Sequence, residues 1–155
     1  MARSERARSL RARLGRPDNR AVEVDAADPS PLASVLAAVA RDPAGDHSAT
    51  ALAARLGVSE RHVGRLFARH AGTTPARYVE SVRVAAARRL LAASTATVAE
   101  VAAAVGFGSA ETMRRAFLRT VGIPPSAVRR RERMSGSEGE VSLQSPHRRR
   151  TLERT

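Results

Sequence analysis

The stretch that decides the fold is residues 98–125, VAEVAAAVGFGSAETMRRAFLRTVGIPP, which repeats an earlier stretch, residues 51–75, ALAARLGVSERHVGRLFARHAGTTP. Each copy contains an alanine-rich segment, a glycine, a serine and a second segment that carries arginines. At an offset of 50 positions, Ser109 falls on Ser59, Met113 on Val63, Arg115 on Arg65, Phe117 on Phe67, Arg119 on Arg69, Gly122 on Gly72 and Pro125 on Pro75. The chain therefore contains an internal repeat, and each copy is predicted to be two short helices joined by a tight turn.

The spacing within each copy has a steric reason. In the first copy, Ala53, Gly57 and Val63 stand at relative positions 0, 4 and 10, where a small residue lets two helices approach, a glycine makes the turn and a valine packs between the helices. The corresponding residues of the second copy are Ala102, Gly106 and Met113. Because the methionine comes one position later, we place the extra residue in the turn and expect Phe107 to cover it. The pattern is typical of a helix-turn-helix unit, whose second helix reads the major groove of DNA.

The second helix of each copy separates apolar residues from arginines. Residues at i, i+3, i+4, i+7 and i+8 predict one buried face. These stripes are Val63, Leu66, Phe67, His70 and Ala71 in the first copy and Met113, Ala116, Phe117, Thr120 and Val121 in the second. Arg61, Arg65 and Arg69 lie four residues apart on another face. Taken alone, such a row of arginines is more often a solvated surface than a DNA-reading one.

We predict an all-α fold with two homeodomain-like helix-turn-helix subdomains joined by a long connecting helix, about seven helices in total. Helix-capping signals support this prediction, because Ser59 stands before the second helix of the first unit and Thr97 forms a capping box with Glu100. The predicted parts are a first helix starting at Pro31, the first helix-turn-helix unit at 49–71 with its second helix at 59–70, the connecting helix at 75–94, the second unit at 97–121 with its second helix at 109–121, and a final basic helix at 126–133.

The predicted connecting helix has a length suited to DNA. About 19 residues at a rise of 1.5 Å span roughly 29 Å, close to the roughly 34 Å that separates successive major-groove segments on one face of the duplex. Its buried row comprises Val79, Val82, Ala86 and Leu90, flanked by Tyr78 and Leu91. Its three inner arginines are predicted to face solvent or to form salt bridges; they are Arg83, Arg88 and Arg89.

The two ends of the chain differ from its centre in composition. Residues 1–30 combine an arginine-rich segment with a proline-containing one and show no wide apolar face, so we expect a basic, weakly ordered leader and linker. Residues 134–155 have the composition of a disordered tail. The predicted domain therefore occupies residues 31–133.

The charge is concentrated on the repeat. All 27 basic residues are arginine, against 15 acidic residues, which gives a net charge of +12. Residues 48–134 hold 15 of these arginines and only five acidic residues, a local charge of +10. Such a surface attracts polyanions in a salt-dependent way. Aromatic residues make up only 3% of the chain, which argues against the stacking surface of a single-strand binder.

Several classes of protein are disfavoured. The chain has no cysteine, and its four histidines, at positions 47, 62, 70 and 147, show no metal-ligand spacing, so we expect no metal and no cofactor. No serine, histidine and acid arrangement or nucleotide-binding glycine loop is recognisable, so we expect no enzyme. No run approaches the roughly 20 apolar residues of a membrane helix, and no signal peptide is recognisable. We therefore expect a cytoplasmic protein without a membrane partner.

Two segments together resemble the AraC/XylS family of transcription regulators: LAARLGVSERHVGRLFARHAGTTPARYVESVRVAAARRLL and VAEVAAAVGFGSAETMRRAFLRTVGIPP. The likeness covers about 100 residues, 31–133, and several spaced elements match in order. It implies a seven-helix domain whose two recognition helices enter adjacent major-groove segments. The sequence of these segments is most similar to that of the GlxA-type branch, whose members usually carry an amidotransferase-like domain ahead of this one. We expect that sensor domain to be missing here.

The resemblance also implies which residues contact DNA. The family's base-reading positions fall on residues 61, 64 and 65 and on residues 110–112 and 115, of which Gly64 and Ala110 carry no donor. The predicted base-reading residues are therefore Arg61, Arg65, Glu111, Thr112 and Arg115. Arginine can bind guanine O6 and N7, glutamate can accept from cytosine N4, and threonine can contact the thymine methyl group. The predicted phosphate contacts are Ser59, Arg69, Ser109, Arg114 and Arg119.

Alternatives stand beside these assignments. Glu111 has a second interpretation, in which it only complements the helix dipole or pairs with Arg115. The favoured function is a sequence-specific double-stranded DNA-binding transcription regulator, with RNA polymerase as a candidate partner and the oligomeric state undetermined. The alternatives are a truncated constitutive or antagonist form without its sensor domain, and a non-specific basic nucleic-acid-binding protein. The family's usual aromatic residue before the final arginine is replaced by Val128, ahead of Arg129.

Overall fold

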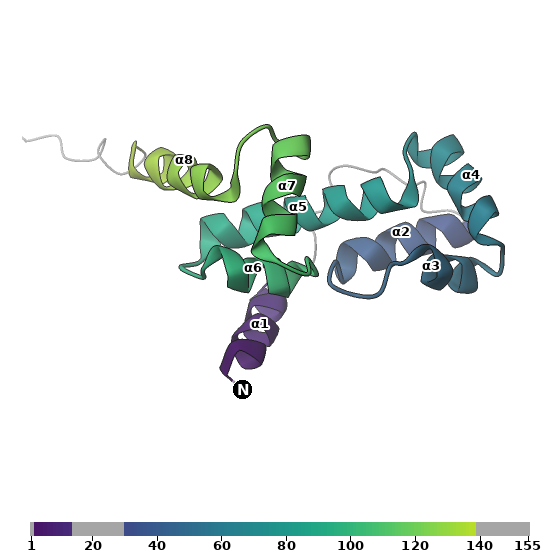
Figure 1. Ribbon diagram of the computed structural model, residues 1–155, viewed down its shortest axis with the longest axis horizontal. Helices are drawn as coiled ribbons and strands as arrows, with labels where there is room; N and C mark the ends of the chain where they lie inside the picture. Colours follow the sequence, from purple (N-terminus) through teal and green to yellow (C-terminus); the bar gives the residue numbers. More distant parts are fainter. Residues whose placement is uncertain (1, 14–29, 139–155) are drawn as a thin grey trace, which may run out of the picture.

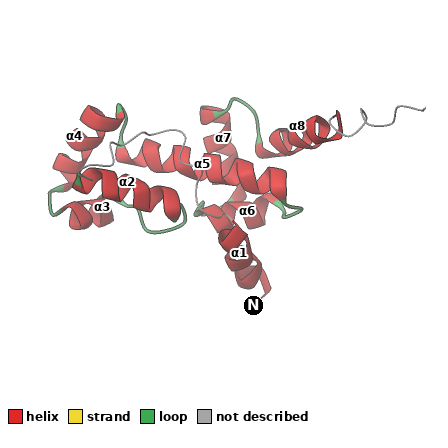
Figure 2. Ribbon diagram, turned by 180° about the vertical axis from the view of Figure 1, so that it is seen from behind, coloured by secondary structure: helices red, strands yellow, loops and turns green. Residues whose placement is uncertain are grey.

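The computed structural model describes residues 2–13 and 30–138, and these residues form eight helices and no strand (Figure 2). The prediction of an all-α fold with two helix-turn-helix units is confirmed. The helices are α1 (Ala2–Arg13), α2 (Pro31–Arg41), α3 (Ala49–Leu56), α4 (Glu60–Ala71), α5 (Pro75–Ala93), α6 (Val98–Val105), α7 (Ala110–Thr120) and α8 (Pro125–Glu138). None of the described helices combines the length and the apolar character needed to cross a membrane.

Helix α5 is the axis of the molecule (Figure 1). Helices α2, α3 and α4 surround its N-terminal half, whereas α6, α7 and α8 surround its C-terminal half. Val79 of α5 belongs to the first core, and Val84, Ala86, Leu90 and Leu91 belong to the second. The change from one core to the other occurs between Val82 and Val84, so Arg83 lies at the junction of the two units.

The first unit is a small helical core with capped helices. Its buried residues are Leu32, Val35, Val39, Leu52, Ala53, Val63, Phe67 and Val79. Ser48 and Ser59 cap α3 and α4 by accepting hydrogen bonds from the backbone N–H groups three residues later. Gly57, with a φ of 65°, lets α3 end and the chain turn within three residues into α4. The ring of Phe67 packs edge-on against the ring of Tyr78 on α5, with the two ring centroids 5.6 Å apart. This contact holds α4 on the connecting helix.

The second unit repeats this arrangement with one extra turn residue. Thr97 and Glu100 form the predicted capping box at the start of α6. Gly106 ends α6 with a φ of 91°, and Phe107 follows it into the core with only 7% exposure. Met113 and Phe117 of α7 are fully buried. The predicted role of Phe107 as the cover of the longer turn therefore agrees with its burial.

Some parts of the structure differ from the sequence-based expectation. The predicted buried stripes are wrong at one residue each, because His70 and Thr120 are exposed near the C-terminal ends of α4 and α7. Residues 2–13 form α1 instead of a weakly ordered leader, since Leu10 is buried against the second core and Arg6 pairs with Glu100 of α6 at 3.3 Å. Helix α8 runs to Glu138, five residues beyond the predicted end at 133. The remaining leader and tail predictions, on residues 14–29 and 139–155, lie outside the described residues.

Candidate nucleic-acid interface

Helix α4 presents the first row of predicted DNA contacts. The side chains of Arg61, Arg65 and Arg69 are all exposed. None of the three forms an ion pair with a carboxylate within residues 2–13 and 30–138. Within the described part of the chain, the one side-chain hydrogen bond of these three arginines joins Arg65 Nη2 to His62 Nδ1 at 3.2 Å. These guanidinium groups therefore face water with their positive charge uncompensated.

The start of α4 is fixed on α3. Ser59 Oγ accepts from the backbone N–H of His62 at 3.2 Å, and Thr50 Oγ1 of α3 donates to the carboxylate of Glu60 at 2.5 Å. In the turn, the N–H of Val58 donates to the carbonyl of Ala53 at 3.1 Å, a bond typical of a glycine-terminated helix end. The direction of the arginine row is thus set by the turn and not by the arginines themselves.

Helix α7 presents the second row, beginning at its own serine cap. Ser109 Oγ accepts from the backbone N–H of Thr112 at 3.1 Å and lies 2.9 Å from Thr112 Oγ1. Both residues are exposed, as are Glu111, Arg114 and Arg115. The predicted base-reading and phosphate-contacting residues at the start of α7 are therefore all accessible to solvent.

Glu111 organises the arginines of α7. Its carboxylate accepts two hydrogen bonds from Arg114, at 2.8 and 3.0 Å, and a third from Nε of Arg115 at 3.0 Å. The Arg114 and Arg115 hydrogen bonds lower the pKa of Glu111 to about 2, because they stabilise the ionised carboxylate. Arg115 uses only Nε in this contact, so its two terminal nitrogens do not bind Glu111. The geometry agrees with the pairing of Glu111 that the sequence left as an alternative.

Arg119 pairs across the junction between helices. Its Nε and Nη2 donate to the two carboxylate oxygens of Glu80 on α5, at 3.3 and 2.6 Å. The pair raises the pKa of Arg119. Glu80 also lies 3.8 Å from Arg77. The predicted phosphate contact at Arg119 therefore competes with an ion pair that the sequence did not indicate.

The sequence prediction missed the role of Arg83. Its Nε donates to the carbonyl of Pro43 at 2.8 Å and its Nη2 to the carbonyl of Gly45 at 3.2 Å. The side chain is therefore half-buried and has no salt bridge with any described residue, whereas Arg88 lies 3.9 Å from Glu132 as a weak salt bridge. A signal was present, because residue 83 is four positions after Val79 and four before Ala87, both of which are buried. That spacing places residue 83 on the inward face of α5.

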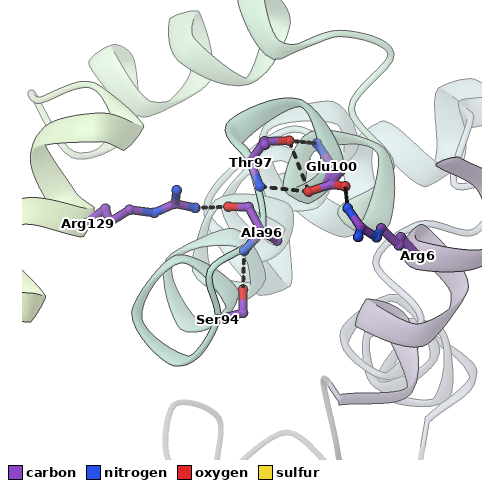
Figure 3. Close-up of polar contacts among 6 residues, drawn as sticks. All are labelled: Arg6, Ser94, Ala96, Thr97, Glu100 and Arg129. Carbon is purple, nitrogen blue, oxygen red and sulfur yellow. Dashed lines mark hydrogen bonds and ion pairs between the residues drawn. The ribbon is translucent and has the colours of Figure 1, made fainter.

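Two arginines from other helices bind the loop between α5 and α6 and the first turn of α6 (Figure 3). Arg129 of α8 donates to the carbonyl of Ala96, and Arg6 of α1 donates to Glu100, which also completes the cap with Thr97. Val128, which replaces the usual aromatic residue, is 3% exposed and belongs to the second core. The final helix is thus anchored by both Val128 and Arg129.

The comparison with known proteins agrees with this geometry. The family described as "Helix-turn-helix domain", which is of the AraC type, matches residues 52–131, just over half of the chain and nearly all of both units. The chain belongs to the AraC/XylS family. The chain is similar to the HTH-type transcriptional regulator Rv1931c of Mycobacterium tuberculosis, at 49% identity over 86 residues or 56% of this chain. It is also similar to the HTH-type transcriptional regulator GlxA of Rhizobium meliloti, at 42% identity over 82 residues or 53% of this chain.

The AraC/XylS likeness extends to solved structures. The DNA-binding domain of AdpA, described as a global transcriptional factor and solved in complex with a target DNA, superimposes with a TM-score of 0.67 at 34% identity. The match covers 71% of this chain and 99% of that one. In contrast, the matched region spans 33% of Rv1931c and 25% of GlxA. The chain therefore corresponds to a third or less of either relative.

Proposed function

We propose that this protein is a sequence-specific double-stranded DNA-binding transcription regulator that reads two adjacent major-groove segments with α4 and α7. The observation that carries the proposal is the exposure of Arg65 and Arg115 at equivalent positions of two helix-turn-helix units that share α5. The family membership and the AdpA domain, which was solved with its target DNA, support it further. The DNA-binding part is proposed to be residues 31–133 together with the rest of α8.

We assign the contacts as two groups. The proposed base-reading residues are Arg61, Arg65, Glu111, Thr112 and Arg115, and the proposed phosphate contacts are Ser59, Arg69, Ser109, Arg114 and Arg119. The capped helix starts support the phosphate assignment, because backbone N–H groups and the helix dipole favour an anion there. As a regulator, the protein is proposed to act on the chromosome in the cytoplasm, without enzymatic activity, with RNA polymerase as a candidate partner.

The proposal is tested by selecting bound duplexes from a random DNA pool. We expect the selected sequences to share two conserved segments about one helical turn apart, bound roughly 10³-fold or more tightly than unrelated DNA. Arg65→Ala and Arg115→Ala should each relax the base preference in a different segment. Equal binding to all duplexes would instead indicate a non-specific basic protein and would overturn the proposal.

A further inference from the structure

The two helix-turn-helix units meet at the middle of α5. Val82 packs against the first core and Val84 is buried in the second, so the residue between them, Arg83, belongs to neither. Each core holds its own recognition helix in place. The angle between the two recognition helices therefore depends on α5 and on the contacts between the two units beside it.

Arg83 crosses this junction toward the first unit. Its two hydrogen bonds go to the carbonyls of Pro43 and Gly45, in the loop that joins α2 to α3. These acceptors lie 40 and 38 residues earlier in the chain. Burial lowers the pKa of Arg83, while Asp42 and Asp46 act in the opposite direction. A partly buried cation of this kind is favourable only when its N–H groups have acceptors, and the loop provides them.

The second unit touches the same place through the turn between α6 and α7. A Cβ atom added to Gly106 would come within 2.7 Å of Ala44 Cα, 3.1 Å of Arg83 Nε and 3.1 Å of the Pro43 carbonyl oxygen. The backbone of the turn is therefore packed directly against the loop and against the guanidinium group. Arg83 is held between a loop of the first unit and a turn of the second.

The units are not packed together throughout. Beside Arg83 lies an open crevice of about 420 Å³, lined by Asp46 and His47 from the first unit and by Phe107 and Thr112 from the second. An open crevice offers little resistance to a change of angle between its walls. The contacts around residue 83, together with the pair of Arg119 with Glu80, therefore carry much of the resistance to bending between the units.

We infer that Arg83 is a positioning residue that fixes the angle between α4 and α7, and thereby the spacing of the two DNA segments that the protein accepts. The inference rests on the proposed function, since it concerns the same DNA-binding surface. Arg83 touches no DNA in this role. The planar guanidinium group of arginine suits this positioning role, because two of its nitrogens, held in fixed geometry like a fork, can bind two carbonyls at once. The single ammonium group of lysine cannot reproduce this geometry.

The angle itself can be measured without DNA. The chain has no cysteine, so spin labels can be placed at Ala54→Cys on α3 and Thr120→Cys on α7, both at exposed positions. We expect a single narrow distance distribution by double electron–electron resonance, which Arg83→Gln broadens or shifts. The matched control is Arg89→Gln, which removes the same charge from an exposed position of the same helix and should leave the distribution unchanged. An unchanged distribution in Arg83→Gln overturns the inference.

A second variant separates positioning from folding and from charge. Arg83→Lys keeps the charge and most of the side chain but loses the fork, so its distribution should be intermediate. Thermal unfolding of all variants shows whether the two cores remain intact. If Arg83→Gln does not fold, the inference is judged on Arg83→Lys alone. A distribution for Arg83→Lys identical to that of the unmodified chain overturns it.

The DNA readout uses the duplex selected above, with zero, one or two base pairs inserted between its segments. The unmodified chain and Arg89→Gln should lose about tenfold or more in affinity per insertion, because both helix-turn-helix units must bind the duplex at once. Arg83→Gln should bind the original duplex more weakly and distinguish the three spacings less. Equal spacing dependence in all three proteins overturns the inference. Failure to select any sequence overturns the proposed function instead, and the label distances still decide the role of Arg83.

Discussion

Helices α4 and α7 each carry one glutamate and three arginines, and they use the glutamate differently. In α4, Glu60 binds Thr50 of α3, and none of the three arginines has a carboxylate partner in the described part of the chain. In α7, Glu111 binds Arg114 and Arg115, while the third arginine, Arg119, pairs with α5. Equal net charge therefore produces one helix with uncompensated arginines and one with arginines already held in place.

This difference separates attraction from orientation. Uncompensated guanidinium groups attract the phosphate backbone most strongly, which favours affinity and salt dependence. A side chain that is already held loses less conformational entropy on binding, and its geometry selects among bases more sharply. We therefore expect α4 to contribute more to general affinity and α7 more to base discrimination.

The largest expected effect concerns the two equivalent arginines. Arg115→Ala should reduce discrimination at one base position by roughly 5- to 150-fold, the range typical of a bidentate base contact. Arg65→Ala should reduce discrimination less, because a single contact with His62 holds Arg65 less firmly than a carboxylate holds Arg115. Binding to duplexes with each base changed in turn measures both values. A larger loss of discrimination for Arg65→Ala would reverse the proposed division between the helices.

Glu111→Gln sharpens this test. If Glu111 acts by orienting Arg115, the variant should weaken discrimination at the same base position as Arg115→Ala. If Glu111 instead accepts from a cytosine, discrimination should fall at a different position. The same set of single-base changes distinguishes the two results.

A smaller effect is expected at the two equivalent phosphate positions. Arg69→Ala should lower the slope of log affinity against log salt by about 0.9, the value for one lost phosphate contact. Arg119→Ala should lower the slope less, because Glu80 already compensates that charge. Both variants should weaken binding to all sequences alike. Glu80→Gln is the control. It leaves Arg119 without its carboxylate partner and should therefore increase the contribution of Arg119 to the slope. Equal slopes for Arg69→Ala and Arg119→Ala would contradict the comparison.

Gly64 offers a third contrast, because Arg114 occupies the equivalent position in α7. Apart from the adjacent backbone of α4 itself, no described atom lies within 4 Å of a Cβ atom built at Gly64, so the fold does not require glycine there. Gly64→Ala should stabilise the protein by roughly 0.5–1 kcal/mol through helix propensity. If α4 approaches DNA closely at this point, affinity should fall although stability rises. Denaturant unfolding and binding to the selected duplex measure the two effects separately, and a rise in both would show that the DNA does not come close to residue 64.

Local signals made much of this structure predictable. The caps at Ser59 and at Thr97 with Glu100 act within three residues, and the glycine turns at Gly57 and Gly106 need only the neighbouring backbone, so all of them could be recognised in the sequence. The repeat then identified both recognition helices, because equivalent residues of two similar units occupy equivalent places. The exposure of Arg65 and Arg115 follows from the same local periodicity.

Contacts between distant segments were not predictable in this way. The pair of Arg119 with Glu80 joins residues 39 apart, and it depends on how α7 crosses α5. The hydrogen bonds from Arg83 to the α2–α3 loop depend on the same relative placement. For α1, the buried side chain of Leu10 and the pair of Arg6 with Glu100 contribute to fixing a helix that has no wide apolar face. Helical periodicity describes one element at a time and is silent on such contacts.

The smallest and most direct test of the comparison is the titration of Glu111. Its pKa in the folded protein is lowered to about 2 from an ordinary value of 4.5, so its stabilising interaction is fully present above about pH 4.5 and is lost as the pH falls through about 2. The carboxyl carbon signal of Glu111 in an NMR titration should therefore have a midpoint near 2. Arg114→Ala should raise that midpoint toward 4.5, and by more than Arg115→Ala does, because the Arg114 hydrogen bonds are the larger cause of the shift. A midpoint near 4.5 in the unmodified protein would mean that Glu111 does not hold the arginines of α7 in solution, and Arg114 and Arg115 would then be as uncompensated as the arginines of α4.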